Sequence, residues 1–298
     1  TVLWPHEYNE IYQTYDRIFG CSGHGWGNLQ STHLNLPFAN DDEFGRLHAA
    51  IRVVMPLLPA LAASTPIIEG DWTPIADQRL EVYRKNSQQV PMMAGLVIPE
   101  PVYDRVSYER DVLGRLYEDL RPLDPDGVLR HEFANARGAI ARFDRGAIEI
   151  RVLDIQECPA ADLAVAALVV AVVRAMVEER WISYERQKEV DTKVLHNVLL
   201  ETIRYAERTR ISERALLESF GIERSMVWAS DIWASMLEQV LPEHPVWTPL
   251  LRRMLGAGTL ATRLDHAIRK YPSHEELQVV YRELADDLAA GRLFRVPD

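Results

Sequence analysis

The chain has 298 residues, of which 47% are hydrophobic and 26% charged, and its formal net charge is -11. These values are typical of a globular protein with a large core, built as one domain or two. The acidic balance argues against general affinity for nucleic acid or anionic membranes, because both require an excess of lysine and arginine. Two cysteines, Cys21 and Cys158, are too few for a disulfide framework or a zinc site, so we expect buried thiols in a reducing, cytoplasmic compartment.

The chain is predicted to open with a helix and then a strand with one polar face. Apolar residues recur at helical spacing from Tyr8 to Phe19, and Gly20 is a natural end for that helix. In the glycine-rich run that follows, His24 is expected to be an ordinary loop histidine. Residues 31–38 (STHLNLPF) then alternate as a strand does, and the proline should end its pairing. The polar positions of that strand are Ser31, His33 and Asn35.

Helices and loops are predicted to follow in the next ninety residues. Residues 41–64 predict a buried helix that is interrupted near Pro56 and Pro59. Residues 65–91 are rich in turn-forming residues and are predicted to be irregular, whereas residues 104–120 have the pattern of an amphipathic helix.

Residues 147–154 (AIEIRVLD) predict a second strand with a charged face. Aliphatic residues alternate with Glu149 and Arg151, so one face can pack on a core while the other carries an ion pair. Such a pair on a wet sheet surface contributes less than about 1 kcal/mol, and that simple interpretation remains open for these two residues alone. An arginine-rich run precedes the strand, with Arg130, Arg137, Arg142 and Arg145.

Beyond Pro159 the sequence is predicted to be helical almost to its end. The most apolar run, residues 163–173, is shorter than a bilayer requires and is typical of a buried helix. The last helix is predicted to begin after Ser273, which stands three residues before Glu276 as in a capping box, and to end near Gly291. The fold class is therefore α+β, with a helical C-terminal third.

Two polar-faced strands and several arginines can form a chemical site. His33 and Glu149 are candidate ligands for Mg²⁺ or Mn²⁺, because these cations prefer carboxylate oxygens and Mn²⁺ tolerates one histidine. The guanidinium groups of Arg137, Arg142 and Arg151 can bind phosphate oxygens. A cation with arginines is suited to stabilising a transferred phosphoryl group. Arg84 and Arg263 are further candidates that could equally be surface charges.

Four segments, in order and spacing, resemble the glutamate–cysteine ligase family 2, a group of carboxylate–amine ligases related in fold to glutamine synthetase. They are STHLNLPF, VVMPLLPALAASTPIIEG, VYRKNSQQ and ARGAIARFDRGAIEIRVLDIQECPAADLAVAALV, and the resemblance is best over residues 20–180. It implies that residues 1–298 form a single catalytic domain. It also implies a curved antiparallel sheet whose concave face holds the active site, flanked by helices, as in glutamine synthetase and guanido kinases.

The resemblance implies an ATP-dependent ligase that uses Mg²⁺ or Mn²⁺ to phosphorylate a carboxylate, usually of glutamate. An amine, classically that of cysteine in a glutathione-type pathway, then attacks the acyl phosphate. By position, Glu149 and His33 would bind the metal, and Arg151 and Arg84 would contact the phosphoryl group or the substrate carboxylate. Arg142, Arg137 and Arg263 would bind the nucleotide. Amino acids are the expected partners, and the chain could assemble as a homo-oligomer.

The family pattern begins with an acidic G-x-E-x-E strand, which this sequence lacks. We therefore expect either a further segment before Thr1 or an incomplete site. In the second case the alternative is a non-catalytic relative that binds a ligand or partner through the same sheet. A phosphagen-kinase-like transferase is a third, weaker alternative.

Overall fold

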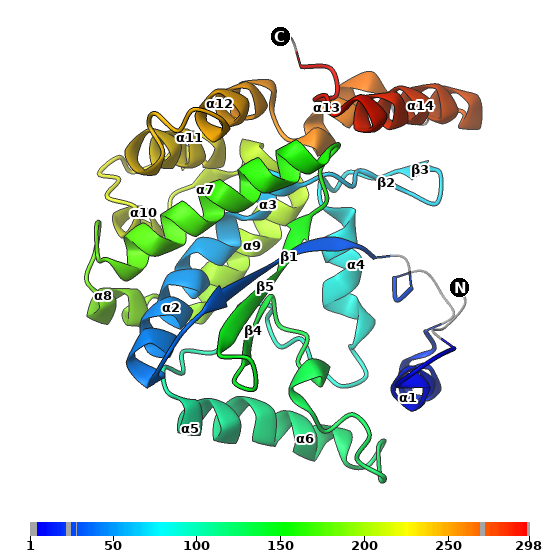
Figure 1. Ribbon diagram of the computed structural model, residues 1–298, viewed down its shortest axis with the longest axis vertical. Coiled ribbons are helices and arrows are strands. Elements are labelled where there is room, and N and C mark those ends of the chain that lie inside the picture. Colours follow the sequence, from blue (N-terminus) through cyan, green and yellow to red (C-terminus); the bar gives the residue numbers. More distant parts are fainter. Residues whose placement is uncertain (1–4, 22–24, 28, 269–271, 297–298) are drawn as a thin grey trace.

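The computed structural model describes residues 5–21, 25–27, 29–268 and 272–296, and Figure 1 shows a small sheet surrounded by helices. The central sheet is antiparallel with strand order β1–β5–β4. Its strands are β1 (Ser31–Pro37), β5 (Ala147–Asp154) and β4 (Ala139–Arg142). Both predicted strands are therefore confirmed, and the charged strand lies at the centre of the sheet.

Two further two-stranded sheets and fourteen α-helices are present in the described part of the chain. The hairpin β2 (Ile67–Ile68) with β3 (Asp71–Trp72) forms one of these sheets, and β6 (Arg210–Ile211) pairs with β7 (Val227–Trp228) across an intervening helix to form the other. The helices are α1 (Asn9–Phe19), α2 (Asp41–Val54), α3 (Pro59–Ala62), α4 (Gln78–Asn86), α5 (Arg105–Tyr108), α6 (Arg115–Leu120), α7 (Pro159–Val177), α8 (Tyr184–Glu189), α9 (Thr192–Tyr205), α10 (Arg214–Ser219), α11 (Ala229–Val240), α12 (Trp247–Ala257), α13 (Leu260–Ala267) and α14 (His274–Ala290).

The core lies between the aliphatic face of the sheet and the helices around it. Helices α2 and α3 pack on β5, and α7 packs in turn on α2, α11 and α12 (Figure 1). Helix α7 is long and apolar enough to cross a membrane by length and composition alone, yet nine of its residues are buried and eight of these belong to this core. The apolar run at 163–173 is thus a core helix, as predicted.

Most helix boundaries follow the sequence pattern. The helix predicted at 41–64 is α2 followed by a short 3₁₀ turn and α3, so the two prolines interrupt it as expected. The predicted helix at 104–120 is α5, a π-helical stretch and α6 in succession. At the other end, the Ser273–Glu276 capping box is present and Gly291 ends α14 in the left-handed conformation.

The prediction that residues 65–91 are irregular was wrong. This stretch holds the β2–β3 hairpin and the nine-residue helix α4. Asp77 starts α4 by accepting a hydrogen bond from the backbone N–H of Leu80. The helix is polar, and it forms because a buried cap and contacts with α9 outweigh its weak apolar pattern.

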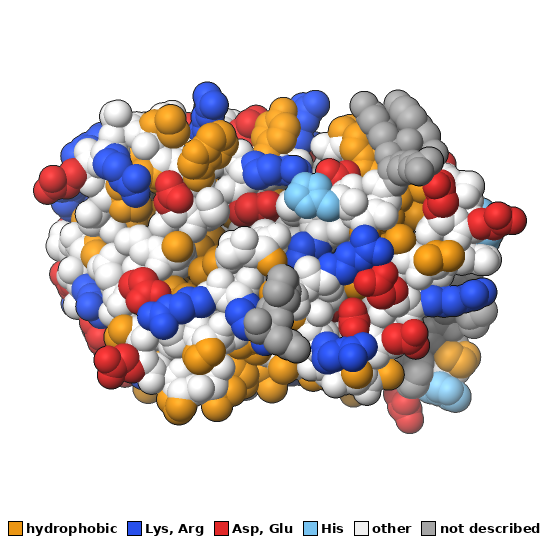
Figure 2. Space-filling model, turned by 90° about the horizontal axis from the view of Figure 1, so that it is seen from above, with side chains coloured by type: hydrophobic (Ala, Val, Ile, Leu, Met, Phe, Trp, Pro, Cys, Tyr) orange, Lys and Arg blue, Asp and Glu red, His pale blue; other side chains and the backbone are white. Residues whose placement is uncertain are grey.

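The surface reflects the acidic composition without a large region of one charge on the face in view. On the side that carries α12, α13 and α14, acidic and basic side chains alternate, with single hydrophobic groups between them (Figure 2). Both cysteines are buried and unpaired, as the sequence predicted.

An aromatic cage within the core surrounds one histidine. His48, on α2, is fully buried and lies 5.3 to 6.1 Å, between ring centroids, from Phe44, Tyr103 and Tyr108. Neither of its ring nitrogens has a hydrogen-bond partner among the described residues. Burial first, and then the nearby positive charges of Arg52 and Arg137, lower the pKa of His48 to about 3. The imidazole is therefore neutral in the folded protein.

Candidate functional site

Glu149 lies at the centre of the polar face of the sheet, surrounded by cationic groups. Its Oε1 accepts hydrogen bonds from His33 Nδ1 at 3.0 Å and from Arg151 Nη2 at 2.7 Å. Its Oε2 lies 3.5 Å from Arg142 Nη1 at the end of β4. The register explains the arrangement, because Glu149 stands opposite Asn35 on β1 and Ile140 on β4. Three strands thus direct their polar groups to one carboxylate.

Hydrogen bonds and neighbouring charges favour the ionised forms of Glu149 and Arg151 against the effect of burial. The hydrogen bond from His33 lowers the pKa of Glu149 to about 2, and Arg151 assists while burial opposes the shift. Burial also disfavours the charge of Arg151, but Tyr83 and Glu149 outweigh it and raise the pKa of the guanidinium. The side chain of Glu149 is only 8% exposed, so the pair is shielded from water. This buried carboxylate is therefore not part of a solvent-exposed surface ion pair, which was the interpretation that the sequence alone still allowed.

An irregularity in the sheet brings a second carboxylate to the same region. The pairing shifts between Thr32 and Leu34, so that His33 on β1 stands opposite two residues of β5, Arg151 and Val152. Such bulges redirect the side chains that follow them. After the bulge, Asp154 pairs with Ser31, which shares a face of β1 with His33.

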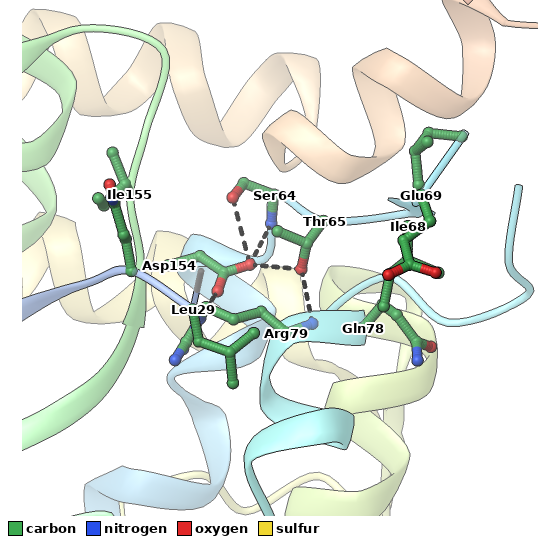
Figure 3. A pocket seen from close by; sticks show the side chains of 11 residues that line it. Leu29, Ser64, Thr65, Ile68, Glu69, Gln78, Arg79, Asp154 and Ile155 are labelled. Atoms are coloured by element: carbon green, nitrogen blue, oxygen red, sulfur yellow. Dashed lines mark hydrogen bonds and ion pairs between the residues drawn. The ribbon is translucent and has the colours of Figure 1, made fainter. Parts of the chain in front are cut away.

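Asp154 is held by four hydrogen bonds at the floor of a cavity (Figure 3). Its Oδ2 accepts from the N–H of Ser64 at 2.8 Å and from the hydroxyl groups of Ser64 and Thr65, and its Oδ1 accepts from Arg79 Nε. Arg79 also donates from Nη2 to the Val152 carbonyl at 2.7 Å. These contacts fix a buried guanidinium next to the polar face.

Two cavities adjoin at Arg79 and Leu29. The first has a volume of about 360 Å³ and is lined by residues of β2, the start of α4 and the end of β5. The second, of about 250 Å³, is lined by His33, Arg151 and Tyr83 together with residues near α1. Arg79 and Leu29 belong to both linings. The Glu149 cluster therefore borders a space large enough for more than one small molecule.

Two further acidic side chains, Asp144 and Glu132, lie beside Arg142. Arg142 Nε is 3.5 Å from Asp144 Oδ1 and 3.6 Å from Glu132 Oε2. Burial, followed by a hydrogen bond with Asp144, raises the pKa of Glu132 to about 7. Arg142 thus contacts both this acidic pair and Glu149, and these contacts on opposite sides fix its side chain at the edge of the site.

The structure gathers four of the seven predicted site residues into this cluster: His33, Glu149, Arg151 and Arg142. The other three bind carboxylates of the chain itself. Arg137 is fully buried and donates hydrogen bonds from Nε and Nη2 to the Glu100 carboxylate at 2.5 and 2.6 Å. Arg84 pairs with Glu81 on α4, and Arg263 on α13 pairs with Glu157 at 2.5 Å. None of the three lines either of the two cavities at the polar face. Their proposed contacts with nucleotide or substrate stay predictions, and His24 lies outside the described residues.

Sequence reasoning missed Arg79, Asp154, Tyr83 and the Ser64–Thr65 pair. Asp154 is the last residue of a strand whose alternation had assigned it to the core face, and only the bulge redirects it. Arg79 and Tyr83 stand on α4, in the segment predicted to be irregular. Asp77, a residue type favoured at the N-cap, was the available signal for the start of that helix.

Comparison with known sequences identifies the relatives of the chain. The profile of the glutamate-cysteine ligase family 2 (GCS2) matches residues 2–282. The chain belongs to this family. An uncharacterized protein of Archaeoglobus fulgidus is 43% identical over 177 residues, which cover 59% of this chain and 48% of that protein. A Nocardioides protein named "Putative glutamate--cysteine ligase 2-1" is 28% identical over 182 residues, which cover 60% of this chain and 42% of that protein.

The chain matches less than half the length of each of these two relatives. Family membership accounts for the mixed α+β architecture and implies a fold like that of glutamine synthetase. Members of the family are ATP-dependent carboxylate–amine ligases and typically use Mg²⁺.

The site of this GCS2 chain offers separate groups for a phosphate and for a cation. Arg151 Nε is buried without a hydrogen-bond partner among the described residues, which leaves donor capacity beside Glu149, whereas Arg142 Nε faces the carboxylates of Asp144 and Glu132. For a cation, Glu149 and His33 offer two ligands, and the described residues contain no group of three His, Cys, Asp or Glu side chains arranged for a metal. Mg²⁺ is often bound by one or two carboxylates together with substrate phosphates and water, so this donor set fits a nucleotide-bound cation.

Proposed function

We propose that this GCS2 protein is an ATP-dependent carboxylate–amine ligase whose reaction centre is the Glu149 cluster. One observation carries the proposal: a buried carboxylate contacts His33, Arg151 and Arg142, and His33 and Arg151 line a cavity that shares Arg79 with a second one. A ligase of this type must hold ATP, a carboxylate and an amine together, and two adjoining cavities with fixed cationic groups suit that task.

In the proposed reaction the substrate carboxylate attacks the γ-phosphorus of ATP. The bond from that phosphorus to ADP breaks, and ADP leaves as an acyl phosphate forms. The amine nitrogen then attacks the acyl carbon, phosphate departs with the carbon–oxygen electron pair, and the amine loses a proton to give the amide. Arg151 and Arg142 are positioned to offset the negative charge that ATP and the carboxylate bring together.

Glu149 and His33 would hold the divalent cation, which neutralises phosphate charge when it is bound. To do so they would exchange their mutual hydrogen bond for contacts with the ion. The low pKa of Glu149, about 2, keeps the carboxylate ionised and ready for this exchange at any physiological pH.

The finer features belong to the same proposal. They are glutamate as the activated carboxylate, an amine such as cysteine as the acceptor, Mn²⁺ as an alternative cation, and a glutathione-type role. They also include a single catalytic domain over residues 1–298, a concave glutamine-synthetase-like sheet, a cytoplasmic location and self-association. Family membership supports the substrate classes, the cation and the sheet, whereas the domain extent, the location and self-association are proposed from the sequence alone.

The experiment measures ADP release by the full-length protein with ATP, Mg²⁺ or Mn²⁺, glutamate and a panel of amines. Release that requires both co-substrates is expected. Glu149→Gln should reduce turnover at least a hundredfold, because the cation loses its carboxylate ligand, and circular dichroism should show a folded protein. Glu201→Gln, at an exposed position on α9, is the matched control and should leave turnover unchanged. Unchanged turnover in Glu149→Gln would refute the proposed role of this carboxylate.

A non-catalytic ligand-binding relative is the second candidate. It is favoured by the absence of a three-ligand metal group among the described residues, and by the chain's own cations contacting both oxygens of Glu149. ATP binding without ADP release for any amine would support it. ADP formed with a guanidino acceptor alone would instead indicate a phosphagen-kinase-like transferase.

A further inference from the structure

The 360 Å³ cavity has aliphatic walls and a polar floor (Figure 3). The side chains of Ile67, Ile68 and Leu29 supply apolar surface, and Ile155 lies at the cavity with 40% of its surface exposed. Two carboxamides, of Gln30 and Gln78, stand among them. Each carboxamide offers both donors and an acceptor, which is what the edge of a nucleobase requires. Flat aromatic ligands are commonly held in this way, between branched aliphatic side chains with a few polar groups at the rim.

Arg79 provides a fixed cation where this cavity meets the smaller one. Its side chain is 5% exposed, and Asp154 and the Val152 carbonyl hold Nε and Nη2. Nη1 has no partner among the described residues. A guanidinium that is anchored on one side and free on the other is suited to bind an anion, because little conformational entropy is lost on binding.

Two acidic side chains, Asp77 and Asp154, lie near Arg79. Burial, and then the neighbouring Asp154 carboxylate, raise the pKa of Asp77 well above its usual range, which favours its uncharged form. Asp154 forms an ion pair with Arg79, so these two charges offset each other. Arg79 itself belongs to the lining of both cavities.

We propose that the 360 Å³ cavity binds the nucleoside part of a nucleotide, with Arg79 holding its phosphates at the junction toward Arg151 and Glu149. This inference rests on the proposed function, which requires ATP near the Glu149 cluster, and it assigns a place to each part of the nucleotide. The smaller cavity, with His33, Arg151 and Tyr83, is then left for the carboxylate substrate. Neither assignment follows from family membership alone.

The test uses binding of ATP, adenosine and inorganic tripolyphosphate, measured by calorimetry on the full chain. Ile155→Trp should fill the cavity from its exposed side without disturbing the core. We expect it to weaken ATP and adenosine at least about tenfold, because the base loses its buried apolar contacts, while tripolyphosphate binding changes less than about twofold. Leu163→Trp is the matched control, since Leu163 is exposed on α7 outside both cavities, and it should change neither.

Arg79→Lys tests the phosphate assignment. Lysine keeps the positive charge beside Asp154 but lacks the planar guanidinium group with its fixed set of hydrogen-bond donors. It should weaken ATP and tripolyphosphate about tenfold and adenosine little. Equal ATP affinity in wild type and Ile155→Trp overturns the nucleoside assignment, and equal tripolyphosphate affinity in Arg79→Lys overturns the phosphate assignment.

The two proposals can fail separately. ATP binding that Ile155→Trp weakens, without ADP release for any amine, supports the cavity assignment and contradicts the ligase. ADP release with both co-substrates, at an ATP affinity that Ile155→Trp leaves unchanged, supports the ligase and overturns the cavity assignment. A wild-type protein that binds none of the three probes overturns both.

Discussion

Replacing His48 with phenylalanine should make the folded protein less sensitive to acid. His48 is fully buried in an aromatic cage and its two ring nitrogens have no partner among the described residues. Burial lowers its pKa from the usual 6.5 to about 3, so protons bind this side chain in the unfolded chain before they bind it in the folded protein. The stability contributed by the neutral ring is complete above pH 6.5 and is lost as the pH falls from 6.5 toward 3.

The magnitude follows from the two pKa values. Each pH unit within this window costs about 1.4 kcal/mol of unfolding free energy per histidine, so the step from pH 7 to pH 5 costs about 2 kcal/mol. Phenylalanine does not titrate and keeps the aromatic contacts with Phe44 and Tyr108. At pH 7 the gain from removing two unpartnered nitrogens and the strain of a larger ring are of similar size, about 1–3 kcal/mol each. The informative quantity is therefore the change with pH.

Urea unfolding, followed by tryptophan fluorescence at pH 7 and pH 5, measures this difference. The unfolding free energy of His48→Phe relative to wild type should rise by about 2 kcal/mol between the two pH values. His274→Phe, at an exposed position on α14, is the control and should show almost no such rise. A difference between His48→Phe and wild type that stays constant from pH 7 to pH 5 would refute the reasoning.

Three further changes test the ion pairs and a helix cap. Arg137→Met should cost about 3–5 kcal/mol of unfolding free energy, because it leaves the Glu100 carboxylate without its buried partner; a loss below 1 kcal/mol in urea unfolding would contradict the assigned structural contact. Arg84→Ala removes a pair that is 28% exposed on the arginine side and should cost less than about 1 kcal/mol. If Arg84 also contacts substrate, as the family resemblance implies, ADP release falls at least tenfold at unchanged stability, and an unchanged rate excludes it from the site. Ser273→Ala removes the capping box of α14 and should cost about 1 kcal/mol, seen as faster amide exchange in the first turn of that helix, whereas unchanged exchange would show that the cap contributes little.

Local patterns predicted the elements whose signals are local. Alternation identified β1 and β5, and the capping box with Gly291 fixed both ends of α14. The two prolines correctly marked the interruption after α2. Helix α4 was not predicted because its side chains are polar. Its stability depends on a buried cap and on packing against α9, and a short stretch of sequence does not contain this information.

The candidate site could be predicted only in part, for a related reason. His33, Glu149 and Arg151 were found because they stand on regular strand faces. Arg142 was proposed as a phosphate-binding residue, and its contact with Glu149 depends on the pairing of β4 with β5, which the sequence analysis did not predict. Arg79 and Asp154 come together across 75 residues of sequence, and the bulge that allows it is a property of the pairing of two strands. Neither strand carries that information by itself.

The bulge opposite His33 changes the face of the sheet to which the following side chains of β5 point. Glu149 and Asp154 are separated by an odd number of positions, which in an unbroken strand would send them to opposite sides of the sheet. A single extra residue at the Arg151–Val152 step lets one continuous strand serve both cavities. If β5 kept its length but paired with β1 without this bulge, regular alternation would turn Asp154 away from Arg79, although every side chain of the cluster would still be present. The spacing of this segment is thus as much a part of the site as its chemistry.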